Sequence, residues 1–186
     1  MTFEEKTIDT ERIFEGKIIN VRRDKVTVME GESFREIVEH NGGAVIAAVK
    51  DDGKMIMVRQ FRKPAERVML EVPAGKIDFG EEPAEAAVRE LKEETGYAAG
   101  KIRKLTQMYP SVGYSEEILH IFLCTDLEAG ETAFDENEAI DIEEYPINTL
   151  VNMVMRGEIQ DGKSQVAILM VKVLLEQGEL QSDLNL

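Results

Sequence analysis

The sequence predicts an α+β fold, with a main domain at residues 41–186 and a small antiparallel strand subdomain at residues 1–40. Short runs of alternating or apolar residues, separated by glycine and aspartate turns, are typical of strands. One later stretch carries the start and stop residues of a helix. A chain of 186 residues that is 43% hydrophobic and 32% charged is long enough to form a sizeable core.

The strands are predicted from alternation and from the turns between them. A polar lead precedes the first strand, the turn Glu30-Gly31-Glu32 follows it, and Asp51-Asp52-Gly53 predicts a hairpin between two apolar runs. The expected strands are residues 16–28, 34–38, 42–49, 55–61, 68–72, 102–108, 118–125 and 139–145. Two further helices are expected at residues 149–156 and 164–177.

Residues 75–97, GKIDFGEEPAEAAVRELKEETGY, predict a helix after a glycine loop. Pro83 suits the first helical turn, where its missing N–H would be unpaired, and Gly96 suits the left-handed residue that ends a helix. The helix is therefore expected from Pro83 to about Thr95. Its inward stripe at helical spacing would contain Ala84, Ala87, Val88, Leu91 and Thr95.

The same helix gathers carboxylates. Glu90, Glu93 and Glu94 occupy one turn near its C-terminus, where like charges repel and the helix dipole disfavours anions. Arg89 lies beside them, and Glu81 comes from the preceding loop. One interpretation is a solvated acidic face. The other is a site for a hard divalent cation, because Mg²⁺ binds carboxylates, waters and substrate phosphates.

Composition restricts the partners. A net charge of −15 would repel nucleic-acid backbones and anionic membrane surfaces, so neither is expected as a partner. The N-terminus has no signal-peptide pattern, and a cytoplasmic location is expected. Cys124 is expected to be a small buried hydrophobe, and His40 and His120 are expected to be structural, with satisfied hydrogen bonds.

A basic island, Arg59, Arg62, Lys63 and Arg67, precedes the acidic stretch. Its members suit either a phosphate-bearing substrate or structural ion pairs with nearby glutamates. Residues 109–117 contain turn formers and are expected to lie on the surface, where recognition loops usually are.

The residues from Gly75 through Glu81 to Arg89-Glu90-Leu91-Lys92-Glu93-Glu94-Thr95-Gly96-Tyr97 resemble, at every defined position, the signature of the Nudix hydrolases. The stretch VRQFRKPAERVMLEVPAGKIDFGEEP, with the later SVGYSEE and DENEAIDI, resembles the ADP-ribose pyrophosphatase branch of that family. The resemblance covers about residues 16–177. It departs at Val112, where the branch usually has proline.

The resemblance implies an alpha/beta/alpha sandwich with a mixed sheet, and a homodimer whose N-terminal strands are exchanged to complete the substrate pocket. It implies hydrolysis of ADP-ribose, or a related nucleoside diphosphate sugar, to AMP and ribose 5-phosphate with two or three Mg²⁺ ions, Mn²⁺ being possible. Two alternatives are a hydrolase of another nucleotide and a sensing module that binds ADP-ribose without cutting it. A sensor would be expected to have lost the signature glutamates, which this chain retains.

The implied roles are assigned residue by residue. Metal ligands would be Glu90, Glu94 and the Ala74 carbonyl, with Glu93 contributing to a further ion and Arg89 and Glu81 orienting the site. Glu136 or Glu138 would be the general base or a further ligand. Residues expected to contact substrate are Arg62, Arg35, Phe14 and Glu71.

Overall fold

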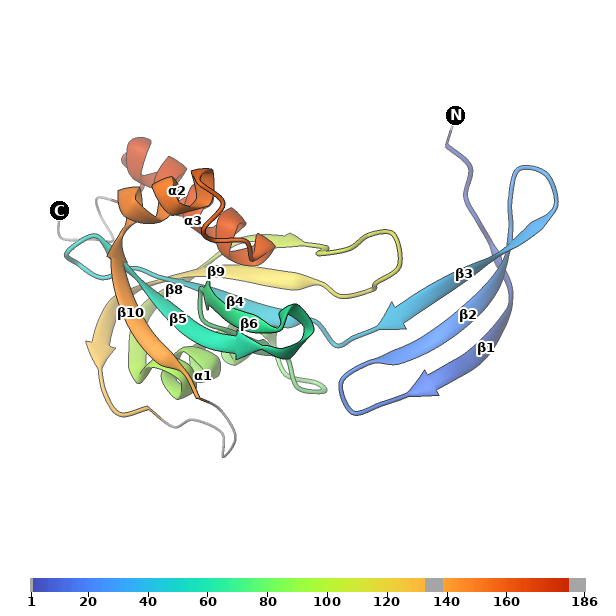
Figure 1. Ribbon diagram of the computed structural model, residues 1–186, viewed down its shortest axis with the longest axis horizontal. Helices are drawn as coiled ribbons and strands as arrows, with labels where there is room; N and C mark the ends of the chain where they lie inside the picture. Colours follow the sequence, from blue (N-terminus) through green and yellow to red (C-terminus); the bar gives the residue numbers. More distant parts are fainter. Residues whose placement is uncertain (1, 133–138, 181–186) are drawn as a thin grey trace. The chain divides into compact units, whose positions relative to one another are not determined.

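The computed structural model describes residues 2–132 and 139–180, and these form two compact units (Figure 1). The first unit contains the residues up to Gly42 together with Tyr109–Ile118. The second contains Gly43–Met108 and the residues from Leu119 on. The sequence did not indicate that the segment 109–118 groups with the N-terminal residues.

An antiparallel sheet forms most of the first unit. Its strands are β1 (Thr7–Glu15), β2 (Asn20–Thr27) and β3 (Glu32–Glu39), in the spatial order β1-β2-β3. The turn between β2 and β3 closes through Val28 N–H donating to Gly31 O, with Gly31 at a φ of 92°. The antiparallel subdomain expected from the sequence is therefore present as a sheet.

β1 was not predicted from the sequence. All of its residues are exposed, so no alternation of apolar and polar residues distinguishes it from a polar lead. It is held instead by its backbone ladder to β2. Residues 16–19, expected to be part of a strand, form the turn between the two strands, in which Gly16 N–H donates to Ile19 O.

Two sheets form the centre of the second unit. One has the order β7-β4-β9-β8, and its parallel β4–β9 pair between antiparallel neighbours makes it mixed, as expected. The other is antiparallel, with the order β10-β5-β6. The strand bounds are β4 (Gly43–Ala48), β5 (Lys54–Arg62), β6 (Arg67–Glu71), β7 (Ala74–Lys76), β8 (Tyr97–Met108), β9 (Leu119–Ala129) and β10 (Asp141–Pro146).

The hairpin predicted at Asp51-Asp52-Gly53 is only partly correct. A turn is present, with Lys50 N–H donating to Lys54 O, but β4 and β5 share a single bridge between Val49 and Met55. The two strands then enter different sheets. The local turn sequence fixes the reversal of the chain, whereas the partners of each strand lie far along the sequence.

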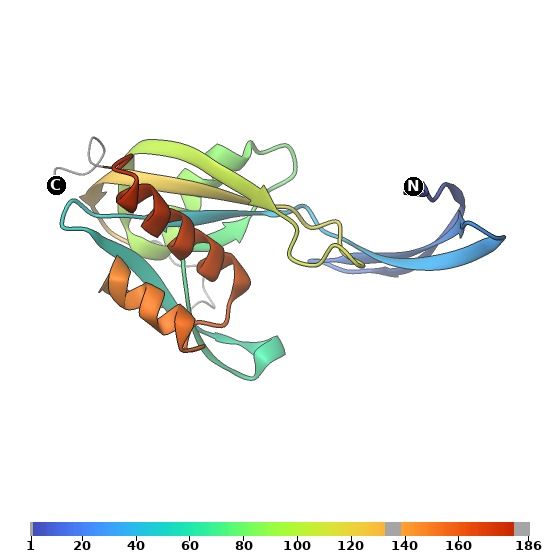
Figure 2. The same ribbon diagram turned by 90° about the horizontal axis from the view of Figure 1, so that it is seen from above.

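Helices cover both faces of the sheets, which gives the expected sandwich (Figures 1 and 2). The helix α1 (Pro83–Thr95) packs on one side, against a cluster that contains Ile46, Ile56 and Phe122. On the other side, α2 (Ile147–Met155) and α3 (Gly162–Glu176) pack on a cluster that contains Val45, Met57 and Ile121. Within the described residues, no helix is long and apolar enough to cross a membrane.

The bounds of α1 agree with those expected from Pro83 and Gly96, and Gly96 has a φ of 75°. Its predicted inward stripe is partly wrong. Ala84 and Val88 are exposed, whereas Ala86 and Glu94 are buried. The helix is rotated so that one of the clustered carboxylates faces the protein interior.

Candidate active site

Arg89 lies at the centre of the acidic cluster on α1. Its guanidinium donates to both carboxylate oxygens of Glu81 at 2.9 and 3.0 Å, to Glu90 at 2.7 Å and to Glu93 at 3.0 Å. It also donates to the carbonyl of Lys76 at 3.0 Å. The hydrogen bonds to Glu81 and Glu90 raise the pKa of Arg89 and keep it charged. Arg89 thus holds three carboxylates together that would otherwise repel one another.

Glu94 is the buried member of the cluster. Only 5% of the residue is exposed, and its carboxylate accepts a hydrogen bond of 3.0 Å from the backbone N–H of Ala74. Ala74 begins β7, a short strand that the sequence did not predict because Ala-Gly-Lys has no strand pattern. Pairing of β7 with β4 fixes this backbone, so the Ala74 peptide and Glu94 lie side by side.

Gly75 is needed because the carboxylate of Glu90 lies against its backbone. A Cβ atom at this position would overlap that carboxylate. The glycine therefore allows Glu90, on the third turn of α1, to reach the loop backbone beside Ala74. Glu90, Glu94 and the Ala74 peptide converge on one corner between β7 and α1.

The donor atoms at this corner suit a hard cation. They are the carboxylate oxygens of Glu90 and Glu94, a kind of ligand that Mg²⁺ prefers. In residues 2–132 and 139–180, no group of three acidic, histidine or cysteine side chains is arranged as a complete metal cage. Arg89 draws Glu90 and Glu93 toward itself instead. A full cage is not required, because Mg²⁺ is usually held by one or two carboxylates together with waters and phosphates.

Arg62 and Glu71 form a second charged group near the same corner. Glu71 is 2% exposed and accepts two hydrogen bonds from Arg62, at 2.8 and 2.9 Å. Burial disfavours its charge, but the bonds from Arg62 and the charge of Lys163 lower the pKa of Glu71 below its usual value. The bond to Glu71, with the nearby charge of Glu94, raises the pKa of Arg62.

Lys163 was not identified from the sequence. Its ammonium donates to Glu71 at 2.5 Å and lies 2.9 Å from Asp161. Asp161 is the N-cap of α3, and Ser164 on the first turn accepts a buried bond of 2.8 Å from Val72 N–H. The start of α3 is therefore tied to the end of β6. The cap pattern Asp-Gly-Lys-Ser predicts a helix start, but not its contact with Glu71.

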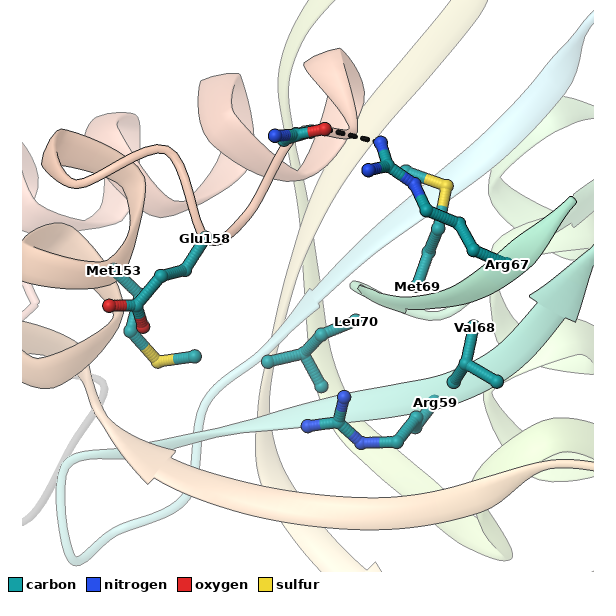
Figure 3. Close-up of a pocket in the computed structure, with 8 residues that line it drawn as sticks. Arg59, Arg67, Val68, Met69, Leu70, Met153 and Glu158 are labelled. Carbon is teal, nitrogen blue, oxygen red and sulfur yellow. Dashed lines mark hydrogen bonds between the residues drawn. The ribbon is translucent and has the colours of Figure 1, made fainter. Parts of the chain in front are cut away.

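The other members of the basic island have partners as well. Arg59 pairs with Glu143, Lys63 with Glu66, and Arg67 donates to Gln160. Arg59 and Arg67 line a cavity of about 330 Å³ that shares no residue with the carboxylate cluster (Figure 3). Its other lining residues are Val68, Met69, Leu70, Met153, Glu158 and Gln160.

The remaining predicted site residues are divided between the two units and the undescribed segment. Phe14 and Arg35 belong to the first unit, where Phe14 is exposed and Arg35 pairs with Glu5. Glu136 and Glu138 lie outside the described residues. The cluster on α1 and the Arg62 group belong to the second unit.

Cys124 is buried as expected, and burial raises the pKa of its thiol to about 12. The expectation of satisfied histidines holds for only one of the two. His40 Nδ1 accepts a bond of 3.0 Å from Gly42 N–H. His120 Nδ1 is buried and has no hydrogen-bond partner among the described residues. Desolvation lowers the pKa of His120, because burial disfavours the charged imidazolium.

The fold and the carboxylate cluster together define a class of protein, the sandwich folds in which a glutamate-rich helix follows a glycine loop. A family model described as NUDIX domain matches residues 40–166. The chain therefore belongs to the Nudix family, whose members generally need a divalent metal ion.

Individual relatives agree with this assignment. An ADP-ribose pyrophosphatase of Bacillus subtilis is 45% identical over 90% of this chain and 92% of its own length. A methanol dehydrogenase activator of Bacillus methanolicus is 38% identical over 89% of this chain and 91% of its own. A solved structure described as an ADP compounds hydrolase has a TM-score of 0.84 at 22% identity, covering 96% of this chain and 98% of that one, which shows the shared fold.

Proposed function

We propose that the protein hydrolyses the pyrophosphate bond of ADP-ribose, giving AMP and ribose 5-phosphate, with the help of divalent metal ions. The observation that carries the proposal is the corner at which Glu90, Glu94 and the Ala74 peptide converge. The similarity to the Bacillus subtilis ADP-ribose pyrophosphatase supports the substrate.

The metal ions, two or three Mg²⁺ with Mn²⁺ as a possible substitute, would be held by Glu90, Glu94 and the Ala74 carbonyl, with Glu93 serving a further ion. When bound, they would neutralise the phosphoryl oxygens and make a water easier to deprotonate. Arg89 contributes by positioning. Its bonds to Glu81, Glu90 and Glu93 keep these carboxylates oriented and offset their mutual repulsion.

Arg62 would bind a substrate phosphate, because a guanidinium donates several hydrogen bonds in a fixed plane. Glu71 fixes that plane by accepting two of those bonds, and Lys163 balances the charge of Glu71. We assign the general base to Glu136 or Glu138, as the resemblance implies. Both lie outside the described residues.

We also propose that the chain acts as a homodimer with exchanged N-terminal strands, and that residues 1–40 and 41–186 are its two domains. The first unit supports this, because it leaves large apolar side chains exposed on one small sheet, which are Ile8, Ile13, Phe14 and Phe34. Phe14 and Arg35 would contact the substrate bound by the partner. We also propose a cytoplasmic location.

Release of AMP from ADP-ribose tests the reaction. We expect AMP and ribose 5-phosphate in equal amounts with Mg²⁺, and no turnover in the presence of excess chelator. A panel containing another nucleoside diphosphate sugar and a damaged nucleoside triphosphate separates the alternatives. Faster turnover of either one would reassign the substrate within the family. Binding of ADP-ribose without cleavage at any metal concentration would instead indicate a sensing module.

A further inference from the structure

A cavity of about 330 Å³ lies along β6, which is an edge strand of the sheet β10-β5-β6 (Figure 3). In the described part of the chain no strand pairs with the outer edge of β6, and its residues 67–70 all line the cavity. All residues of the cavity wall belong to the second unit. The remaining walls come from β5, α2 and the segment between α2 and α3, with Arg59, Met153, Glu158 and Gln160.

Arg67 is the one arginine in residues 2–132 and 139–180 that pairs with no carboxylate. Its guanidinium donates to the side-chain oxygen of Gln160, whose amide nitrogen donates to Gly157 O at 3.0 Å and so fixes the orientation of that oxygen. Every other arginine pairs with a glutamate or an aspartate. In a chain with 22 basic and 37 acidic residues, an uncompensated guanidinium therefore lies on the cavity wall. Such a group can bind an oxyanion through several hydrogen bonds.

Arg59 brings a second guanidinium to the same cavity. Its Nε and Nη2 donate to the two carboxylate oxygens of Glu143 at 2.5 and 3.0 Å, which fixes the guanidinium and leaves Nη1 available to a ligand. Glu158 also lines the cavity and would repel an anion, but Arg156 donates to it at 2.7 Å. These two ion pairs are each neutral, so Arg67 gives the cavity one excess positive charge. The balance favours a ligand that carries a single anionic group.

The rest of the wall is apolar and comes from Val68, Met69, Leu70 and Met153. Methionine sulfur makes favourable contacts with aromatic rings, and a guanidinium plane stacks on them. The volume is at the lower end of the roughly 300–1,000 Å³ of small-molecule sites, so a ring system fits beside an oxyanion. A bare phosphate ion would leave the two methionines without a partner.

We propose that this cavity binds a nucleoside monophosphate, with the phosphate on Arg67 and Arg59 and the base against Met69 and Met153. The inference goes beyond the proposed hydrolysis and does not depend on it, because the cavity shares no residue with the carboxylate cluster. AMP is the probe used below.

Nuclear magnetic resonance of protein labelled with ¹³C at the methionine methyl groups measures binding at this place. Met69→Leu and Met153→Leu, which nearly conserve volume, assign the two signals. With chelator present, AMP should shift both signals of the wild-type protein with a Kd below about 1 mM. Binding is measured rather than turnover, because Arg67 lies opposite Arg62 on the paired strand. Absence of any shift in these two signals at about 10 mM AMP would overturn the proposal.

Arg67→Gln tests the phosphate contact, and Arg103→Gln is the matched control. Arg103 is also an exposed arginine on a strand of the second unit, and it pairs with Glu179 at 3.7 Å, away from the cavity. Arg67→Gln should weaken AMP binding at least about tenfold, because a hydrogen bond to a charged group is lost, whereas Arg103→Gln should stay within about twofold of wild type. Equal affinities of Arg67→Gln and wild type would contradict the assignment of the phosphate to Arg67.

Three further ligands and one variant define what the cavity recognises. Adenosine, ribose 5-phosphate and inorganic phosphate each lack the base or the phosphate, and each should bind at least about tenfold more weakly than AMP. Inorganic phosphate that binds as tightly as AMP would reveal a simple anion site and overturn the role given to the methionines. Glu90→Gln should bind AMP as wild type does. Loss of the two shifts in that variant would place AMP at the carboxylate cluster instead.

Discussion

Glu94 shows why a single residue decides the proposed chemistry. Its carboxylate is nearly buried at a helix end, where the dipole and neighbouring glutamates oppose its charge, and it accepts a hydrogen bond from the Ala74 N–H. A buried carboxylate is costly unless it is paired or coordinates a metal ion. The proposed role of Glu94 is to bind a cation together with Glu90.

Glu94→Gln tests this role without changing the shape of the side chain. We expect the variant to keep the wild-type melting temperature within a few degrees, because the amide oxygen still accepts the bond from Ala74. Activity should fall by at least about a hundredfold, since a ligand charge is lost. Glu85→Gln, on the exposed first turn of α1, is the control. An unfolded Glu94→Gln protein, or one with full activity, would refute the assignment.

Glu71 gives a prediction about stability and pH. Its pKa is lowered in the folded protein, so its ion pairs stabilise the fold above the ordinary glutamate pKa and are lost as the pH falls through the lowered value. Glu71→Gln should cost about 3 kcal/mol near pH 7, because it removes the charge of a buried carboxylate that pairs with Arg62 and Lys163. The difference in unfolding free energy from wild type should shrink as the pH falls below about 4.5.

Denaturant unfolding at a series of pH values measures this difference. Glu158→Gln, which removes only an exposed partner of Arg156, should show little effect at any pH. A Glu71→Gln deficit that stays constant down to pH 3 would mean that the charge of Glu71 does not stabilise the fold.

At the scale of single residues, the sequence predicted that Glu90, Glu93 and Glu94 lie together, because they share one helix at fixed offsets. It could not predict the partner of Glu71, since Lys163 is 92 positions away and meets it only through the packing of α3 on β6. The same limit applies to the ion pair between Arg22 and Glu116, which are 94 positions apart.

Among the elements, α1 and the short strand β7 determine the geometry of the site. Gly75 is the point at which they approach most closely. We predict that Gly75→Ala folds, because the group that must move is the flexible end of Glu90. Activity should nevertheless fall at least about tenfold, since displacement of a catalytic group by an ångström is enough for a large loss.

Gly162→Ala is the control for Gly75→Ala, because an added Cβ atom there meets no neighbour. It should keep full activity. Steady-state kinetics and a thermal melt of both variants provide the comparison. Wild-type turnover in Gly75→Ala would show that the approach of Glu90 to the loop backbone is not required.

The elements that the sequence predicted are those with local signals. The helix α1 has Pro83 and Gly96 at its ends, and β6 is an apolar run that ends before Pro73. The strands β1 and β7 had no local signal, because the apolar residues of β1 do not alternate with polar ones and β7 is only Ala-Gly-Lys. The separation of β4 and β5 into two sheets depends on pairing with distant strands, which no local pattern encodes.

The whole molecule carries a net charge of −15, yet the proposed substrate is an anion. Bound cations at the α1 cluster would offset this repulsion locally. The first unit raises a separate question, because a small sheet with exposed Ile13, Phe14 and Phe34 has little core of its own.

We predict that formation of a homodimer buries the exposed apolar side chains of the first unit. Sedimentation velocity should give a dimer of the 20.9 kDa chain, and Ile13→Asp together with Phe34→Asp should shift it to a monomer of reduced activity. Exposed Glu85→Gln should remain dimeric. A wild-type monomer with full activity at micromolar concentration would exclude the exchange of strands.

The central claim is that the carboxylates on α1 hold divalent cations that act on a diphosphate. Titration of Mn²⁺ followed by electron paramagnetic resonance tests it most directly, because bound and free ions are distinguished without any turnover. The account predicts that wild-type protein binds Mn²⁺ and that the double variant Glu90→Gln, Glu94→Gln loses at least about tenfold in affinity. Equal binding of Mn²⁺ by the two proteins would contradict it.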